Sequence, residues 1–372
     1  MPGREHRHVM PVLWVTGPPG VGKTAVAWEI YRRLTHAGAG PAYVDVDQLG
    51  MCYPATASDP DRHRLKARNV ACLRASFAEA GARCLIVSGV VDSERGPNLD
   101  EIGGSPVAVG RLRVDPGELR ARLVRRMGST AQPDAAVEEA AAYDRSNFAP
   151  WCVDTTGLSI DEAAGRVITE IGDWPPAGPD RRGASPPASR AGGELLWVSG
   201  ATGVGKSTVG FGAYMKRLRT GATAAYVDVD QIGFCSTAPH DHVLRARNLA
   251  ALWDNFHEAG ARQAVVTGPV STAAEARRYE EALPMAKFTW CRLHVNDQEL
   301  TRRILSRRDG GGWAQPGDPL RGQPVEELLR VADRVIADAR SLERHDVGRR
   351  IDIDDMGIDD AVETVLGITH WP

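Results

Sequence analysis

Residues 17–24, GPPGVGKT, satisfy the pattern G-x-x-x-x-G-K-[ST], and residues 200–207, GATGVGKS, satisfy it a second time. The two lysines of the pattern are 183 positions apart (206 minus 23). The neighbouring sequence repeats as well, because residues 42–48, AYVDVDQ, recur unchanged at residues 225–231 with the same spacing. A loop that recurs together with its flanks marks a duplicated unit.

The repeat has the length of a whole domain, not of a solenoid repeat. Between the copies, residues 174–193 are rich in Pro, Gly, Ser and Arg and have no apolar periodicity. This composition is typical of a semi-rigid, solvated linker. The sequence therefore predicts one domain over residues 1–173, a linker over 174–193 and a second domain over 194–372.

Within one copy, strand patterns alternate with helix patterns. Residues 12–16 form an apolar run that stops at a glycine, and residues 25–34 carry apolar residues at helical spacing. Further apolar runs over residues 42–46 and 84–88 predict two more buried strands. This alternation indicates the α/β class, with two tandem P-loop NTPase domains that each have a parallel sheet covered by helices on both faces.

Composition excludes several classes of protein. The net charge is −3 and the sequence pI is near 6.4, which argues against a nucleic-acid partner. The sequence has no run of about 18 apolar residues, which predicts no membrane-spanning helix. Six scattered cysteines without C-x-x-C spacing predict reduced thiols and a cytoplasmic location; Cys52 and Cys235 occupy equivalent positions. Whether the chain is a monomer or a homodimer is not decided by these features.

The repeated loop predicts two nucleotide sites. Its glycines let the backbone approach phosphate oxygens closely, and the following helix presents its positive N-terminal end. Lys23 and Lys206 are expected to reach the β- and γ-phosphates of ATP, and the hydroxyls of Thr24 and Ser207 to bind Mg²⁺. The glycines expected to bind the cofactor are Gly17, Gly20, Gly22, Gly200, Gly203 and Gly205.

Paired aspartates end the second predicted strand of each copy. Alternation along a strand places Asp45 and Asp47 on the same side, and their equivalents are Asp228 and Asp230. Asp47 and Asp230 are interpreted as the carboxylates that orient an acceptor hydroxyl. Asp45 and Asp228 are interpreted as metal-side or structural partners beside the substrate. The open alternative is that one aspartate of each pair only caps a turn.

The third predicted strand ends in a hydroxyl residue instead of an acid. Residues 84–89 read CLIVSG and residues 264–268 read AVVTG. Many motor-type NTPases place a magnesium-binding aspartate and a catalytic glutamate here. Their absence from both copies argues against a mechanochemical ATPase and makes plain ATP hydrolysis a weaker hypothesis.

With these motifs, each copy resembles the small P-loop kinases of the adenylylsulfate, shikimate and gluconate kinase group. The likeness extends from the phosphate loop to residues 154–159, DTTGLS, which are similar to the segment that these kinases place near adenine. The resemblance implies Mg-dependent phosphoryl transfer from ATP to a hydroxyl of a small metabolite, nucleoside or natural product. It also implies a lid whose arginines close on the triphosphate; the lid candidates are Arg122, Arg125, Arg126, Arg303, Arg307 and Arg308, with Arg126 and Arg307 as catalytic candidates.

The roles of the arginines and the choice between a kinase and its rival remain open at this level. Any one of these arginines is equally well a residue of a solvated helix face. Arg68 and Arg247 lie on the expected acceptor-side helix and meet either an acceptor anion or water. Copy 2 also carries a Gly-rich stretch and a long helical pattern over residues 325–342 that copy 1 lacks, which predicts a fuller lid in copy 2. The rival to a kinase is a regulatory or binding module that uses ATP as a switch.

Overall fold

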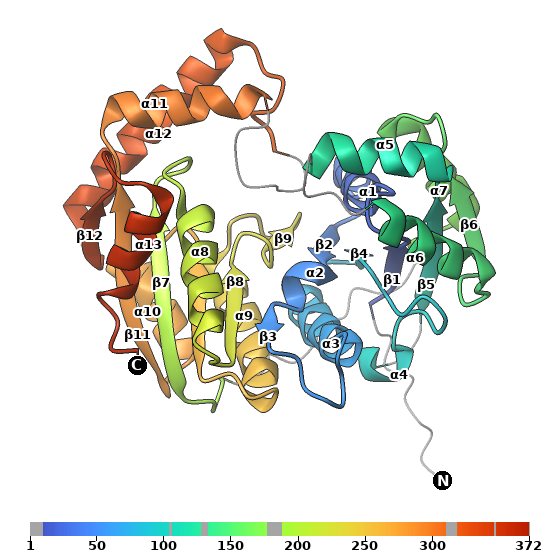
Figure 1. The fold of residues 1–372 in the computed structure, drawn as a ribbon, viewed down its shortest axis with the longest axis horizontal. Coiled ribbons are helices and arrows are strands. Elements are labelled where there is room, and N and C mark those ends of the chain that lie inside the picture. Colours follow the sequence, from blue (N-terminus) through green and yellow to red (C-terminus); the bar gives the residue numbers. More distant parts are fainter. Residues whose placement is uncertain are drawn as a thin grey trace. The chain divides into compact units, whose positions relative to one another are not determined.

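The computed structural model describes residues 10–103, 106–127, 133–176, 188–309, 318–345 and 347–371, and Figure 1 shows the fold. The chain divides into two compact units. Unit 1 contains residues Met1–Gly50, Asp61–Pro186 and Phe234–Pro239. Unit 2 contains residues Met51–Pro60, Pro187–Gly233 and His240–Pro372.

Unit 1 is built on a six-stranded sheet with the strand order β6-β5-β1-β4-β2-β9. The strands are parallel except β9, which is antiparallel to β2. The strands of unit 1 are β1 (Val12–Thr16), β2 (Pro41–Asp45), β4 (Cys84–Ser88), β5 (Val107–Arg113), β6 (Trp151–Asp154) and β9 (Phe234–Cys235). Its helices are α1 (Lys23–His36), α2 (Val46–Leu49), α3 (His63–Glu79), α4 (Leu99–Ile102), α5 (Pro116–Met127), α6 (Pro133–Arg145) and α7 (Ile160–Ile171).

Unit 2 repeats this plan with the order β12-β11-β7-β10-β8-β3, in which only β3 is antiparallel to its neighbour. The strands of unit 2 are β3 (Cys52–Tyr53), β7 (Gly193–Gly200), β8 (Ala224–Asp228), β10 (Gln263–Thr267), β11 (Ala286–His294) and β12 (Arg349–Asp352). Its helices are α8 (Lys206–Arg219), α9 (His242–Glu258), α10 (Ala273–Ala282), α11 (Asp297–Ser306), the 3₁₀ turn η2 (Arg307–Asp309), α12 (Val325–His345) and α13 (Ile358–Leu366).

Burial along the central strands explains the layered architecture. Every residue of β1 and of β4 is buried, as is every residue of β8 and β10. Because successive side chains of a strand point to opposite faces, this pattern requires both faces of each sheet to be covered. The structure thus confirms the predicted α/β class with parallel-dominated sheets.

The units differ from the sequence ranges that were predicted as domains. Those ranges, 1–173 and 194–372, each run along the chain without interruption. In the structure, residues Met51–Pro60 belong to unit 2 and residues Phe234–Pro239 belong to unit 1. The physical reason is strand pairing: β3 of the first half pairs with β8, and β9 of the second half pairs with β2. In Figure 1, β3 has the blue of the first half and lies beside the yellow β8.

Among the described residues, no helix combines the length and the apolar character that crossing a membrane requires.

Candidate functional site

The loop between β1 and α1 is a tight turn with three positions whose backbone conformation favours glycine. Gly17, Gly20 and Gly22 have φ of +145°, +84° and +104°, a region that favours glycine. A Cβ at Gly17 would lie 2.5 Å from the carbonyl oxygen of Leu112. The loop of unit 2 is equivalent, because a Cβ at Gly200 would lie 2.6 Å from the carbonyl oxygen of Leu293. Gly203 and Gly205 have φ of +83° and +102°.

The first residue of the following helix is the lysine of the loop. Lys23 Nζ donates a hydrogen bond to the carbonyl oxygen of Pro18 at 2.9 Å, and Lys206 Nζ donates to that of Ala201 at 2.9 Å. Burial lowers the pKa of both ammonium groups, and nearby aspartates oppose this shift. Each ammonium therefore lies against its own loop, at the helix end that suits phosphate binding.

A hydroxyl and a carboxylate meet beside each lysine. Thr24 Oγ1 donates to Asp45 Oδ2 at 2.9 Å, and Ser207 Oγ donates to Asp228 Oδ2 at 2.9 Å. We call these the hydroxyl–carboxylate pairs. In unit 1 the Ser88 hydroxyl, at the end of β4, also donates to Asp45 at 3.1 Å. The hydroxyl that replaces an acid on the third strand therefore orients this carboxylate in unit 1.

These pairs fit a magnesium ion. Hydroxyl and carboxylate oxygens are the hard ligands that Mg²⁺ prefers. Burial, followed by the charge of Asp47, raises the pKa of Asp45. Burial and the charge of Asp230 raise the pKa of Asp228 to about 6. A buried carboxyl next to a second carboxyl is a group whose charged form a divalent cation stabilises. Thr24 with Asp45, and Ser207 with Asp228, are the residues that would hold the ion.

The second aspartate of each pair is not on the strand, so the argument from strand alternation was wrong in its geometry. β2 ends at Asp45, whose side chain caps the single turn of α2 by accepting from the backbone N–H of Asp47 at 2.9 Å. In unit 2, the backbone N–H of Asp230 donates to Asp228 at 3.0 Å. This hydrogen bond from the backbone to the first aspartate replaces a continued strand, so the chain turns directly after that aspartate.

Each second aspartate contacts a buried cation, and we call these contacts the carboxylate–cation pairs. Lys66 Nζ lies 3.0 Å from Asp47 Oδ1, and Arg245 Nη2 lies 2.8 Å from Asp230 Oδ1. The cation side chains are 9% and 5% exposed, whereas the carboxylates are 49% and 36% exposed. Each carboxylate is thus paired with a buried cation and keeps part of its own surface exposed to solvent.

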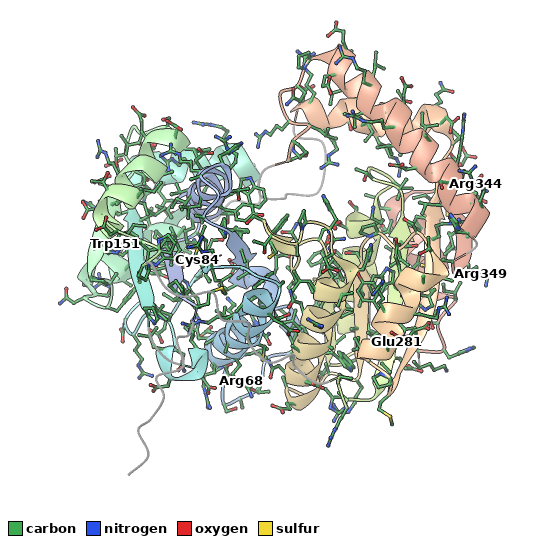
Figure 2. All side chains as sticks on the ribbon, turned by 180° about the vertical axis from the view of Figure 1, so that it is seen from behind. Arg68, Cys84, Trp151, Glu281, Arg344 and Arg349 are labelled. Atoms are coloured by element: carbon green, nitrogen blue, oxygen red, sulfur yellow. The ribbon has the colours of Figure 1, made fainter. Side chains whose placement is uncertain are left out.

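Sequence reasoning missed these two cations. Lys66 and Arg245 occupy equivalent positions, two residues before Arg68 and Arg247, and a basic residue at both was the available signal. Arg68 and Arg247 are half-buried on α3 and α9, and both interact with other residues of the chain. Figure 2 labels Arg68 on α3. The structure brings Lys66 and Arg245 onto the carboxylates.

The predicted lid arginines have different positions. Arg122 Nη1 donates to the carbonyl oxygen of Val21 at 3.0 Å, and Arg303 Nη1 donates to that of Val204 at 2.6 Å. These two arginines therefore brace the loops from α5 and α11. Arg307 forms an ion pair with Asp318 at 2.9 Å. The side chain of Arg126 lies outside the described residues.

Two aspartates act on each loop lysine, and the further charged groups differ: Glu139 and Lys66 in unit 1, and Arg307 in unit 2. In unit 1, Glu139 of α6 is half-buried; burial raises its pKa, and Lys23, Asp47 and Lys66 all act on it electrostatically. α6 is fixed by Tyr143, whose hydroxyl donates to the carbonyl oxygen of Val91 at 2.8 Å and accepts from its N–H at 3.1 Å. Unit 1 therefore holds a carboxyl group that acts electrostatically on the loop lysine.

In unit 2, Arg307 is the further group that acts on Lys206. A polar cluster also lies near Asp230 and Arg245. His242 Nδ1 is 2.9 Å from the Tyr279 hydroxyl, and His242 Nε2 is 3.7 Å from Glu275. Burial lowers the pKa of His242. Nothing in the sequence pattern separated these residues from ordinary helix positions.

A family model described as an AAA domain matches residues 13–143, which lie in the first half of the chain. No curated protein matches the chain. The solved structures to which it is similar include the tunicamycin resistance protein of Deinococcus radiodurans, at 22% identity and a TM-score of 0.34, over 44% of this chain and 96% of that one.

Two kinases are similar at slightly lower identity and TM-score. A gluconokinase from Sinorhizobium meliloti 1021 matches at 18% identity and a TM-score of 0.31, over 47% of this chain and 90% of its own. A shikimate kinase from Bacteroides thetaiotaomicron matches at 17% identity and a TM-score of 0.29, over 44% of this chain and 98% of its own. Each similarity covers less than half of this chain and nearly all of the other.

Proposed function

We propose that the protein is a phosphotransferase that moves the γ-phosphoryl group of ATP to a hydroxyl of a small molecule. The observation that carries the proposal is the adjacency, in each unit, of a hydroxyl–carboxylate pair and a carboxylate–cation pair beside the loop lysine. One pair suits a metal ion, and the other presents an open carboxylate to an acceptor. Plain nucleotide binding requires only the first of these arrangements.

The residues divide into two groups by role. Lys23 and Lys206 neutralise phosphate charge, and Thr24 with Asp45, or Ser207 with Asp228, hold magnesium, which supplies further neutralisation when bound. Asp47 and Asp230 orient the acceptor hydroxyl and accept its proton. The new bond forms between the acceptor oxygen and the γ-phosphorus as the bond to the β,γ-bridging oxygen breaks, and ADP leaves.

The cation of each carboxylate–cation pair keeps the carboxylate in place. Lys66 and Arg245 are buried, so their charge is poorly screened by solvent and attracts the neighbouring carboxylate. An ionised carboxylate accepts a hydrogen bond from a hydroxyl, whereas a protonated one competes with it as a donor. This arrangement supports the acceptor-orienting role.

For unit 1 alone, one observation favours a regulatory nucleotide site over a catalytic one. Glu139 places a carboxyl within electrostatic reach of Lys23, where bound phosphate adds further negative charge. Such a group weakens phosphate binding and phosphoryl transfer. We propose that unit 2 is the main catalyst and that unit 1 binds nucleotide with little turnover, as a regulatory site.

The test is acceptor-dependent release of ADP by the full-length protein with Mg²⁺ and ATP. A panel of sugars, polyols, hydroxy acids, nucleosides and nucleoside-like antibiotics is screened. At least one acceptor is expected to stimulate ADP release and to be recovered with one added phosphate by mass spectrometry. With that acceptor, Asp230→Asn should reduce kcat by about 100-fold or more.

Asp333→Asn is the matched control, because Asp333 is exposed on α12 of the same unit. It should leave kcat unchanged. If no acceptor in the panel stimulates ADP release while ATP still binds, the switch-type binding module replaces the kinase as the best reading.

A further inference from the structure

Two short segments complete the sheets of the units in a reciprocal way. Residues Met51–Pro60 and Phe234–Pro239, here called the exchanged segments, each belong to the unit that the other half of the sequence mainly forms. In the pairing of β9 with β2, Cys235 lies opposite Ala42. In the pairing of β3 with β8, Cys52 lies opposite Ala225.

The two exchanges share one register. Cys235 follows Cys52 by 183 positions, and Ala225 follows Ala42 by the same 183. This is the period of the duplicated loop and its flanks. The exchange is therefore a property of the repeated unit, made once in each direction.

Specific contacts anchor the segment in unit 1. The ring of Phe234 lies 4.8 Å from that of Trp28 and 5.9 Å from that of Tyr43. The backbone N–H of Ser236 donates to the carbonyl oxygen of Pro41 at 3.0 Å. The hydroxyl of Thr237 donates to the carbonyl oxygen of Ala80 at 2.9 Å. The segment thus covers an edge of the sheet that would otherwise have unpaired backbone groups.

The segment in unit 2 is anchored in a similar way. Met51 packs against the hydrophobic core of that unit, and its carbonyl oxygen accepts from the N–H of Tyr226 at 2.9 Å. Cys52 is buried, and its sulfur approaches the carbonyl oxygen of Phe256 at 3.9 Å. Both segments therefore combine an apolar anchor with ladder hydrogen bonds.

Each exchanged segment begins directly after the loop that carries the exposed aspartate. Gly50 is the last residue before the first segment, and a Cβ there would lie 2.7 Å from Lys66 Cε. Asn69 is fully buried and donates to the carbonyl oxygen of Leu49 at 2.6 Å. In unit 1 the short helix α2 and Gly50 are thus tied to α3.

The loop of unit 2 has the same ties. A Cβ at Gly233 would lie 2.8 Å from Arg245 Nε, and Asn248 donates to the carbonyl oxygen of Ile232 at 2.6 Å. One residue further along the chain, Phe234 is packed in unit 1. The loop is therefore held at one end by its own unit and at the other end by an anchor in the other unit's sheet.

We propose that the exchanged segments clasp the two halves of the chain together, so that the loop behind Asp47 and the loop behind Asp230 each depend on both halves. The interaction surface is the open edge of β2 or of β8, and the partner that it fits is the equivalent segment of the other half of the same chain. The clasp does not rest on the proposed phosphotransfer, because it follows from pairing and packing alone.

The equivalence of the two pairings provides a direct test. Each edge strand, β2 or β8, could pair with the short segment of its own half or with that of the other half. If the segments are exchanged, a cysteine at position 42 faces Cys235. If each segment folds back on its own half, that cysteine faces Cys52. The Cα atoms of directly opposed residues in antiparallel strands are about 4.5–5.5 Å apart, within the range of a disulfide. Ala42→Cys in the full-length protein therefore reports the partner through the disulfide that forms.

The same experiment also cuts the linker between the two halves of the chain, so that only the disulfide and noncovalent contacts can hold them together. A protease recognition sequence is inserted within residues 177–187, the Pro-rich stretch of the predicted linker, and the full-length Ala42→Cys protein is oxidised mildly and then cleaved. We expect one species on a non-reducing gel and a peptide that links residues 42 and 235. A 42–52 disulfide with two separate fragments, or a disulfide between two chains, would overturn the proposal.

Two further cysteine variants and one control without a cysteine change keep the result interpretable. Ala42→Cys combined with Cys235→Ser should lose the cross-link. Ala225→Cys, opposite Cys52, should form the reciprocal disulfide and covers the case in which Ala42→Cys does not fold. The cleaved protein without any cysteine change should elute as a single species on size exclusion, and elution as two folded fragments counts against the clasp.

A hydrogen-exchange measurement tests transmission to the loop. Phe234→Ala removes the anchor in unit 1, and we expect faster amide exchange at residues 229–233 of unit 2. Phe288→Ala is the matched control, since Phe288 is also half-buried and stacks on Trp290 in β11 of unit 2. It should leave the exchange of residues 229–233 unchanged. Faster exchange confined to the neighbours of Trp28 and Tyr43 in Phe234→Ala would contradict a dependent loop.

Discussion

The two units hold their loop lysines in the same way and surround them with different charges. Lys23 and Lys206 each donate to a loop carbonyl at 2.9 Å, and each stands beside a hydroxyl–carboxylate pair. Yet Glu139 and the cation Lys66 act on the lysine in unit 1, whereas Arg307, itself paired with Asp318, acts on the lysine in unit 2. The duplicated parts are those that contact the loop backbone, and the parts that differ come from α6 and from η2. Under the proposed function, this difference predicts unequal activities in the two units.

The largest expected effect comes from removing each lysine. Titration with a non-hydrolysable ATP analogue and Mg²⁺ should give two equivalents per chain for the unmodified protein and one for Lys23→Ala or Lys206→Ala. Lys206→Ala should reduce acceptor-dependent turnover by about 100-fold or more, because it removes a positioned charge from the transferring phosphoryl group. Lys23→Ala should reduce it much less. Equal losses of turnover would break the proposed division between the units.

The next effect concerns stability and should be alike in both units. Asn69→Ala and Asn248→Ala each leave a backbone carbonyl, that of Leu49 or of Ile232, without its side-chain donor. Each change should lower the free energy of unfolding by about 1–3 kcal/mol. Urea denaturation followed by tryptophan fluorescence measures it. A cost confined to one variant would show that the two loops are not tied equivalently.

A smaller effect should separate the units again. Glu139→Gln removes a negative charge near Lys23 and should tighten binding of the Mg²⁺-nucleotide analogue to unit 1 by roughly fivefold, which corresponds to about 1 kcal/mol. Arg307→Gln should weaken binding to unit 2 by a similar factor. Calorimetry on a Lys206→Ala background isolates the first site, and a Lys23→Ala background isolates the second. Unchanged affinity in Glu139→Gln would remove the main reason for treating unit 1 as regulatory.

The sequence predicted the parts of the site that are local in the chain. A strand over residues 12–16, a glycine turn and a helix follow from apolar runs and from the loop pattern, and the structure has β1 at Val12–Thr16 and α1 at Lys23–His36. The aspartates at the end of β2 were also found, although their geometry was not. Asp45 caps α2, and the strand ends there, two residues before the Asp47 that the alternation argument placed on it.

The parts that depend on long-range packing were not predictable. Asp47 and Lys66 are separated by an exchanged segment, and helical periodicity does not say which basic residue of α3 meets the carboxylate. β3 and β9 have two residues each, too short for any pattern, and they pair in equivalent registers with β8 and β2. Glu139 acts electrostatically on Lys23 from α6, which Tyr143 ties to Val91, a contact that the sequence does not reveal.

The smallest expected effect is a pH dependence of stability. Glu299 holds Arg303, which braces the loop of unit 2, and its hydrogen bonds with Arg302 and then Arg303 lower its pKa to about 2. Glu118 holds Arg122 in unit 1; its pKa is lowered first by the backbone N–H of Gly157 and then by Arg122. A carboxyl with a lowered pKa in the folded state stabilises that state above its ordinary pKa of 4.5, and this contribution is lost as the pH falls toward the folded-state value. The urea midpoint of Glu299→Gln should thus lie below that of the unmodified protein at pH 7, and the gap should shrink steadily below pH 4.5. Glu118→Gln, measured in parallel, should show a gap of the same sign in unit 1. A gap for Glu299→Gln that stays constant from pH 7 to pH 3 would mean that the brace acts through packing and not through charge.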